Sequence, residues 1–146
     1  VHAFDMQQEA LERTRERLAE HGVLDRASLH LADHGDMEEV LKEARGMVRA
    51  VMFNLGFLPG SDSPVVTQPD STLKGLSASL GILAPDGVLS VVCYEGHEGG
   101  EQETQAVEGW MRALDFERYR VLRFEVCNMP GSPIILFFVE SVARTL

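Results

Sequence analysis

A loop rich in Gly and Pro, opened by one carboxamide side chain, follows the apolar segment 47–53. It begins at Asn54 and reads Asn-Leu-Gly-Phe-Leu-Pro-Gly. The apolar segment predicts a buried strand, and ligands of open α/β sheets bind at the carboxyl ends of strands. Asn54 offers one carbonyl acceptor and two amide donors, which suits an amine or a nucleobase edge. The alternative is a capping Asn in a turn, but Thr67-Gln68-Pro69, which closes this long loop, favours a functional site.

A second glycine-rich loop follows another apolar run, 88–94, and reads Glu-Gly-His-Glu-Gly-Gly after Tyr94. Its glycines permit a substrate to approach the backbone closely. Tyr94 is suited to stacking on a base, and His97 to hydrogen bonding or accepting a proton. The alternative for Tyr94 is an aromatic side chain that covers the core. The spacing of His97 and its flanking glutamates does not match a site of three or four metal ligands, so we expect no metal.

Acidic residues end two further predicted strands. Asp5 ends the first, where such residues accept hydrogen bonds from ribose hydroxyls, although the accompanying glycine-rich loop is absent. Its alternative role is helix N-cap. Gln7 is near enough to reach the same ligand, or is a solvated helix residue. Asp33 and His34 follow the next strand and suit an adenine edge, with an Asx-turn as the alternative.

Four arginines lie within twelve positions near the C-terminus: Arg112, Arg118, Arg120 and Arg123. They fit either a phosphate footprint or the solvated face of a helix and a charged edge strand. The formal net charge of −10 argues against non-specific binding of nucleic acid, which depends on neutralising phosphates. A local basic patch remains compatible with that charge.

Hydrophobic periodicity predicts the order β-α-β-α-β-α-β-α-β-β. Strands are expected at 1–5, 27–32, 47–53, 88–94, 119–126 and 134–140, helices at 6–21, 36–44, 70–83 and 101–114, and a turn at 85–87. Strands alternating with helices predict a mostly parallel α/β sheet covered on both faces. The last two strands are joined too closely for a crossover helix, so they should form an antiparallel hairpin. The apolar segment 134–139 should be central in its sheet.

The length of 146 residues indicates one domain, and its 45% hydrophobic and 25% charged residues are ordinary for a soluble protein. No apolar run is long enough to span a bilayer. Cys93 and Cys127 each lie in an apolar run, which indicates buried free thiols in a reducing, cytoplasmic compartment. The sequence leaves the oligomeric state open, a homodimer included.

Taken together and in order, these motifs resemble one family, the bacterial group labelled "putative rRNA methylase", which is similar to class I S-adenosylmethionine-dependent methyltransferases. The motifs are Phe4-Asp5-x-Gln7, Asp33-His34, the loop from Asn54 to Gly60, Thr67-Gln68-Pro69 and Tyr94-x-Gly96-His97-x-Gly99-Gly100. The resemblance implies a Rossmann-like methyltransferase domain over residues 1–146, with S-adenosylmethionine as cofactor. It also implies tRNA as the substrate, because members are implicated in methylating 5-aminomethyl-2-thiouridine at the wobble position.

The resemblance further implies how the donor is bound. Asp5 and Gln7 would hold its ribose. Asp33 and His34 fall where the family has Ser-His near the adenosine, and the Asp places a charge beside the donor.

For the acceptor, the resemblance implies that Asn54 aligns the target nitrogen and that Tyr94 and His97 face the tRNA base. Transfer of a methyl group to a neutral amine depends on in-line placement more than on acid–base power. Asn54 would accept a hydrogen bond from the amine, and His97 would remove its proton. Further substrate contacts are expected from three loop residues: Gly56, Thr67 and Gln68.

The family opens with a strand and a Gly/Asn-rich loop that cradles the methionine part of the donor, and this sequence begins after both. That strand would lie between the strands at 1–5 and 47–53, and without it buried backbone groups would stay unpaired. We therefore expect the 146 residues to be a fragment, or a truncated gene product, that binds the donor weakly or not at all. The alternatives are an rRNA or small-amine methyltransferase, a non-catalytic binding module, and an NAD-type domain using Asp5, against which the terminal hairpin and the Asn54 loop argue.

Overall fold

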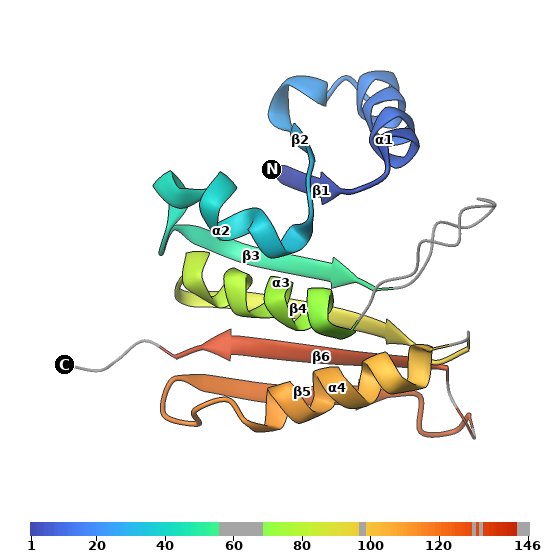
Figure 1. The fold of residues 1–146 in the computed structure, drawn as a ribbon, viewed down its shortest axis with the longest axis vertical. Coiled ribbons are helices and arrows are strands. Elements are labelled where there is room, and N and C mark those ends of the chain that lie inside the picture. The colour runs from blue at the N-terminus through green and yellow to red at the C-terminus, as the bar shows by residue number, and fades with distance from the viewer. Residues whose placement is uncertain (56–68, 97–98, 130, 132, 143–146) are drawn as a thin grey trace.

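Two sheets and the helices around them make up the chain (Figure 1). The computed structural model describes residues 1–55, 69–96, 99–129, 131 and 133–142. β1 (His2–Asp5) pairs in parallel with β2 (Ser28–Leu31) as a two-stranded sheet. These two strands do not pair with the larger sheet. The resemblance implied a further strand between the strands at 1–5 and 47–53, and no described strand lies there.

The larger sheet has the strand order β3-β4-β6-β5. β3 (Val48–Asn54) runs parallel to β4 (Leu83–Tyr94), whereas β6 (Ile134–Ser141) runs antiparallel to β4 and to β5 (Tyr119–Glu125). The predicted α/β class and the C-terminal antiparallel hairpin are confirmed. The apolar strand β6 is central, as expected, because it pairs on both sides.

Four α-helices and three 3₁₀ turns connect the described strands. They are α1 (Gln8–Glu20), η1 (Leu24–Arg26), η2 (His34–Asp36), α2 (Met37–Val40), η3 (Lys42–Ala44), α3 (Pro69–Ile82) and α4 (Gly100–Arg112). The single helix predicted for 36–44 is wrong, because this segment divides into η2, α2 and η3. Asp36 makes no capping bond there, and its Oδ1 instead accepts a hydrogen bond from Lys74 Nζ at 2.7 Å. None of the helices in the described part is long and apolar enough to cross a membrane.

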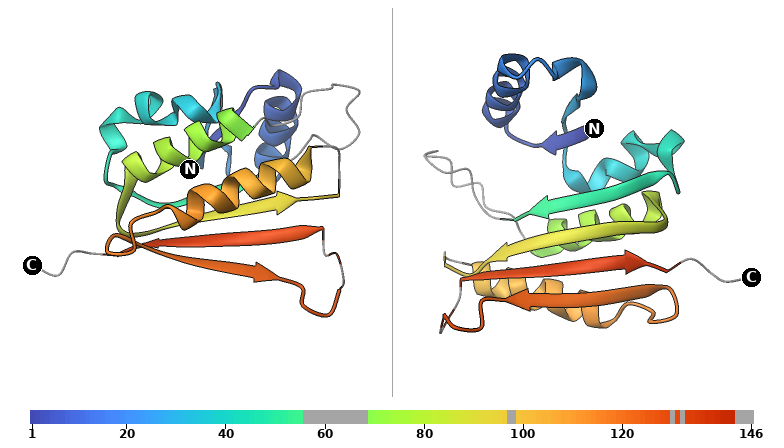
Figure 2. Two further views of the ribbon diagram at one scale, coloured as in Figure 1. Left: turned by 60° about the horizontal axis from the view of Figure 1, so that its bottom comes forward. Right: turned by 180° about the vertical axis from the view of Figure 1, so that it is seen from behind.

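Helices α3 and α4 pack on one face of the four-stranded sheet (Figure 2). Alternation along β4 buries Leu89, Val91 and Cys93 beneath these helices, and they join the hydrophobic core. The opposite face carries no helix among the described residues, and Met52 on it is 82% exposed. The expected cover on both faces is therefore not found in the described part of the chain.

Helix α3 and the 3₁₀ turn η2 approach each other closely at Gly75. A Cβ at Gly75 of α3 would overlap Cδ2 of His34 and would come within 3.1 Å of Phe53 Cε1. The absence of a side chain at this helical position therefore lets the imidazole lie directly against the helix.

Two local predictions need correction. The turn expected at 85–87 lies inside β4, where Asp86 has φ 61° and the register with β3 shifts between Val48 and Ala50. It is a bulge in a continuous strand. Both cysteines are free, but only Cys93 is buried; Cys127 is exposed because it follows the end of β5, where no neighbouring strand or helix covers it.

Candidate functional site

Two predicted substrate contacts meet at the carboxyl edge of the larger sheet. Asn54 is the last residue of β3 and Tyr94 the last residue of β4, and these parallel strands end at the same edge. The Tyr94 hydroxyl donates a hydrogen bond to Asn54 Oδ1 at 3.0 Å. Alternation places both side chains on the helix-free face, where Asn54 is exposed. The structure thus unites residues that are 40 positions apart.

This hydrogen bond fixes the orientation of the Asn54 carboxamide. The carbonyl oxygen points to Tyr94, so the amide nitrogen, with its two donors, points away from it. One lone pair of Oδ1 remains for a second donor. The pair can therefore present both a donor and an acceptor to a ligand without first having to rotate the amide.

Asp5 ends β1 with one carboxylate oxygen engaged locally. Its Oδ1 accepts a hydrogen bond from the backbone N–H of Gln7 at 2.8 Å. Gln7, not Asp5, occupies the N-cap position of α1. Among the described residues the second carboxylate oxygen of Asp5 takes no hydrogen bond, so it is available to a hydroxyl donor. Ribose binding by Asp5 and Gln7 stays a prediction.

Asp33 and His34 make contacts inside the protein. Asp33 Oδ1 accepts a hydrogen bond from Gly35 N at 2.6 Å, which is the Asx-turn foreseen as the alternative. The Nε2 atom of His34 lies 3.1 Å from the carbonyl oxygen of Ser71. Because a carbonyl oxygen can only accept, Nε2 carries the proton and donates this hydrogen bond. The imidazole also meets the Phe53 ring edge-on, with centroids 5.5 Å apart. Contact of this pair with adenosine stays a prediction.

Four predicted site residues lie outside the described residues: Gly56, Thr67, Gln68 and His97. Their roles stay predictions. Among the residues that the structure does describe, no group of three or more His, Cys, Asp or Glu side chains could hold a metal ion.

The C-terminal arginines are engaged with neighbouring side chains. Arg112 pairs with Glu108 at 2.6 Å and Arg123 with Glu125 at 2.6 Å. The guanidinium of Arg120 lies 3.7 Å from the centroid of the Phe116 ring. These contacts favour the reading of a solvated, self-paired surface over a phosphate footprint.

Sequence reasoning missed one polar contact behind the site. Glu103 of α4 is buried and accepts a hydrogen bond from Thr72 Oγ1 of α3 at 2.6 Å. A signal was present, because Glu103 shares the buried stripe of α4 with Val107 and Met111 at helical spacing. Burial, reinforced by the negative charge of Glu103, raises the pKa of the Cys93 thiol to about 12.

Comparison with known sequences identifies methylases. A family model described as "Putative rRNA methylase" matches residues 1–140. The chain is 36% identical over 143 residues to a protein of Arabidopsis thaliana named "tRNA (mnm(5)s(2)U34)-methyltransferase, chloroplastic". That match covers 96% of this chain and 52% of the plant protein, so the chain spans about half the length of this curated relative.

Solved structures agree with these matches. A "putative rRNA-methylase" from Clostridium thermocellum superimposes with a TM-score of 0.90 at 32% identity, over 97% of this chain and 75% of that one. A "putative methyltransferase" from Streptococcus mutans, solved in complex with SAH, gives a TM-score of 0.84 at 32% identity, over 97% of this chain and 76% of that one. The fold described above is thus a methyltransferase fold.

Proposed function

Because the chain belongs to the family described as "Putative rRNA methylase", we propose that it acts as an S-adenosylmethionine-dependent N-methyltransferase. Its proposed substrate is 5-aminomethyl-(2-thio)uridine at the wobble position of tRNA. The observation that carries this proposal is the hydrogen bond from Tyr94 to Asn54 at the carboxyl edge of the sheet. It holds a carboxamide in one orientation, beside an aromatic ring, where a nucleobase with an amine substituent would be received.

The residues at the ends of β1 and β2 fit the nucleoside part of the donor. Asp5 keeps one carboxylate oxygen for a ribose hydroxyl while the other is held by Gln7 N. Asp33 and His34 follow the neighbouring strand, at the same edge. When bound, S-adenosylmethionine supplies an electrophilic methyl group on a sulfonium. The plant relative's name and the SAH complex of the streptococcal protein support this assignment.

Asn54 orients the acceptor amine. The free lone pair of its Oδ1 accepts one N–H of the neutral amine, which directs the nitrogen lone pair away from the carboxamide. Holding a nucleophile in the attacking geometry is the main requirement of this reaction. Tyr94 contributes by fixing the carboxamide, and its ring offers a surface on which the pyrimidine stacks.

The amine must lose one proton as the new N–C bond forms. We assign its removal to His97, three positions after Tyr94 in the sequence. An imidazole is ordinarily part-neutral near pH 7 and is a common general base.

A second candidate is the same chemistry on rRNA or a small amine. The family description favours an rRNA, and the net charge of −10 favours a small acceptor over a long polyanion. A non-catalytic binding module would keep the Asn54–Tyr94 pair but transfer no methyl group.

Mass spectrometry of nucleosides separates these readings. Deleting the gene should remove 5-methylaminomethyl-2-thiouridine from tRNA and leave 5-aminomethyl-2-thiouridine in its place. Loss of a methylated nucleoside from rRNA instead would support the second candidate. Unchanged nucleosides in both RNAs would contradict an RNA substrate, and a further lack of S-adenosylmethionine binding in calorimetry would contradict the methyltransferase proposal.

A further inference from the structure

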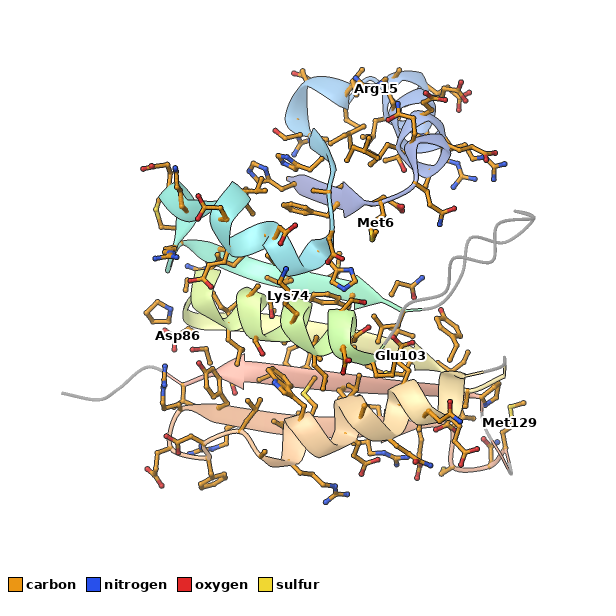
Figure 3. All side chains as sticks on the ribbon, in the orientation of Figure 1. Met6, Arg15, Lys74, Asp86, Glu103 and Met129 are labelled. Atoms are coloured by element: carbon orange, nitrogen blue, oxygen red, sulfur yellow. The ribbon has the colours of Figure 1, made fainter. Side chains whose placement is uncertain are left out.

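A buried glutamate joins the first turns of α3 and α4. Glu103 is 4% exposed, and the threonine that donates to its Oε1, Thr72, is fully buried. Figure 3 shows Glu103 between the two helices. An apolar pair would be the less costly choice for packing alone, because burying a carboxylate carries a desolvation cost that close partners must offset. The hydrogen bond therefore points to a task other than filling the core.

The two joined helix starts are the attachment points of the predicted acceptor loops. Helix α3 begins at Pro69, directly after Thr67 and Gln68 in the sequence. Helix α4 begins at Gly100, three positions after His97. A bond between the two first turns therefore sets the separation of the points from which both loops leave.

The same glutamate also lies behind the strand end that carries Tyr94. Its negative charge acts on the buried thiol of Cys93, the residue before Tyr94 in β4. Cys93 faces the helices while Tyr94, one residue later, faces the opposite side of the sheet. Glu103 thus contacts both helix starts on one side of β4, and the Asn54–Tyr94 pair lies on the other.

We propose that Glu103 is a positioning residue for methyl transfer, acting through its hydrogen bond with Thr72 to hold the first turns of α3 and α4 and the end of β4 in one arrangement. It touches neither donor nor acceptor. This inference rests on the proposed function, since it concerns the geometry of the same site. Glu103 acts on the rate of transfer and leaves donor binding at the ends of β1 and β2 unchanged.

The test removes the hydrogen-bond donor by substituting Thr72, because valine has nearly the same shape as threonine and preserves the packing of the core. Thr72→Val removes the hydroxyl and should lower kcat about tenfold, the scale of a small misplacement of reacting groups. The dissociation constant of SAH should not change, whereas partial unfolding would instead reduce the number of SAH sites. Thr72→Ser restores a hydroxyl and should restore kcat. Glu101→Gln, an exposed residue of the same helix turn, is the matched control and should behave as wild type.

Hydrogen exchange provides a readout that does not need the reaction. Thr72→Val should speed amide exchange in the first turns of both α3 and α4 while leaving α1 unchanged. If the wild-type protein transfers no methyl group, the proposed function fails and the role in transfer fails with it; the exchange pattern then tests only whether the Glu103–Thr72 bond joins the two helix starts. A kcat of Thr72→Val within twofold of an active wild type, or faster exchange confined to α3, would overturn the role of Glu103.

Discussion

The Asn54–Tyr94 pair and the Asp33–His34 pair both lie at carboxyl ends of strands, the first in the larger sheet and the second beside β2, yet their polar atoms have different partners. Asn54 is exposed, and its bond to Tyr94 leaves the amide nitrogen and one carbonyl lone pair for a ligand. In the other pair, Asp33 closes a turn on Gly35 and His34 holds the carbonyl of Ser71. Position at the edge of a sheet therefore does not by itself show which polar atoms are left for a ligand; the partners within the protein do.

The largest expected effect is on catalysis by Asn54→Ala. Removing the carboxamide should lower kcat about 100-fold, because the amine loses the group that orients it. Stability should change little, since Asn54 is exposed. The measurement is methyl transfer by the purified full gene product, alongside its melting temperature. Met52→Ala, two residues earlier on the same exposed face, is the control, and equal losses in both variants would contradict a specific role for Asn54.

The next effect concerns the Asp33–His34 pair. Gly75→Ala would force a methyl group into the His34 ring and should reduce the free energy of unfolding by about 2 kcal/mol, as overpacking does. Urea unfolding measures it. Gly109→Ala is matched, because its Cβ would meet nothing within 4 Å and it should stabilise α4 by about 0.5–1 kcal/mol. Equal stability of the two variants would show that His34 is not held against α3.

A smaller effect is expected at Asp33. Asp33→Ala loses the turn bond to Gly35 and should reduce stability by about 1 kcal/mol, whereas Asp33→Asn keeps an acceptor and most of the stability. Calorimetric titration of S-adenosylmethionine into Asp33→Asn then sharpens the comparison. Unchanged affinity makes Asp33 purely a scaffold, and weaker binding at native stability assigns it to the donor site as well.

The smallest expected effect is on the stability of Tyr94→Phe. This change removes a hydroxyl bonded to an exposed side chain, so the free energy of unfolding should change by less than about 0.5 kcal/mol. A loss of several kcal/mol in denaturant unfolding would show instead that the Tyr94–Asn54 hydrogen bond is needed to stabilise the fold.

Much of the architecture follows from local sequence patterns. The apolar runs at β3, β4 and β6 and the short β5–β6 joint suffice to predict these strands, their order along the chain and the antiparallel hairpin, because burial on a sheet requires that patterning. The order of the strands within the sheet was not predicted. The segment 36–44 was predicted wrongly: it divides into three short pieces, of which η2 and α2 pack against α3. Exposure of Cys127 depends on where β5 ends.

For the site, sequence identified the strand-end residues but not their partners. That Tyr94 bonds Asn54 depends on the register of β3 with β4, and that His34 bonds Ser71 depends on a glycine 41 positions away, Gly75. The Glu103–Thr72 bond joins two helices whose facing sides are set only by the tertiary fold. Contacts of this kind are non-local, so periodicity within one segment carries no information about them.

The most direct test of the account is a double-mutant cycle on kcat with Asn54→Ala and Tyr94→Phe. If Tyr94 acts by fixing the Asn54 carboxamide, Tyr94→Phe should lower kcat about tenfold in the wild-type protein and should have no effect once Asn54 is alanine. Equal effects of Tyr94→Phe in both backgrounds, or no effect in the wild type, would contradict the claim that this pair orients the acceptor.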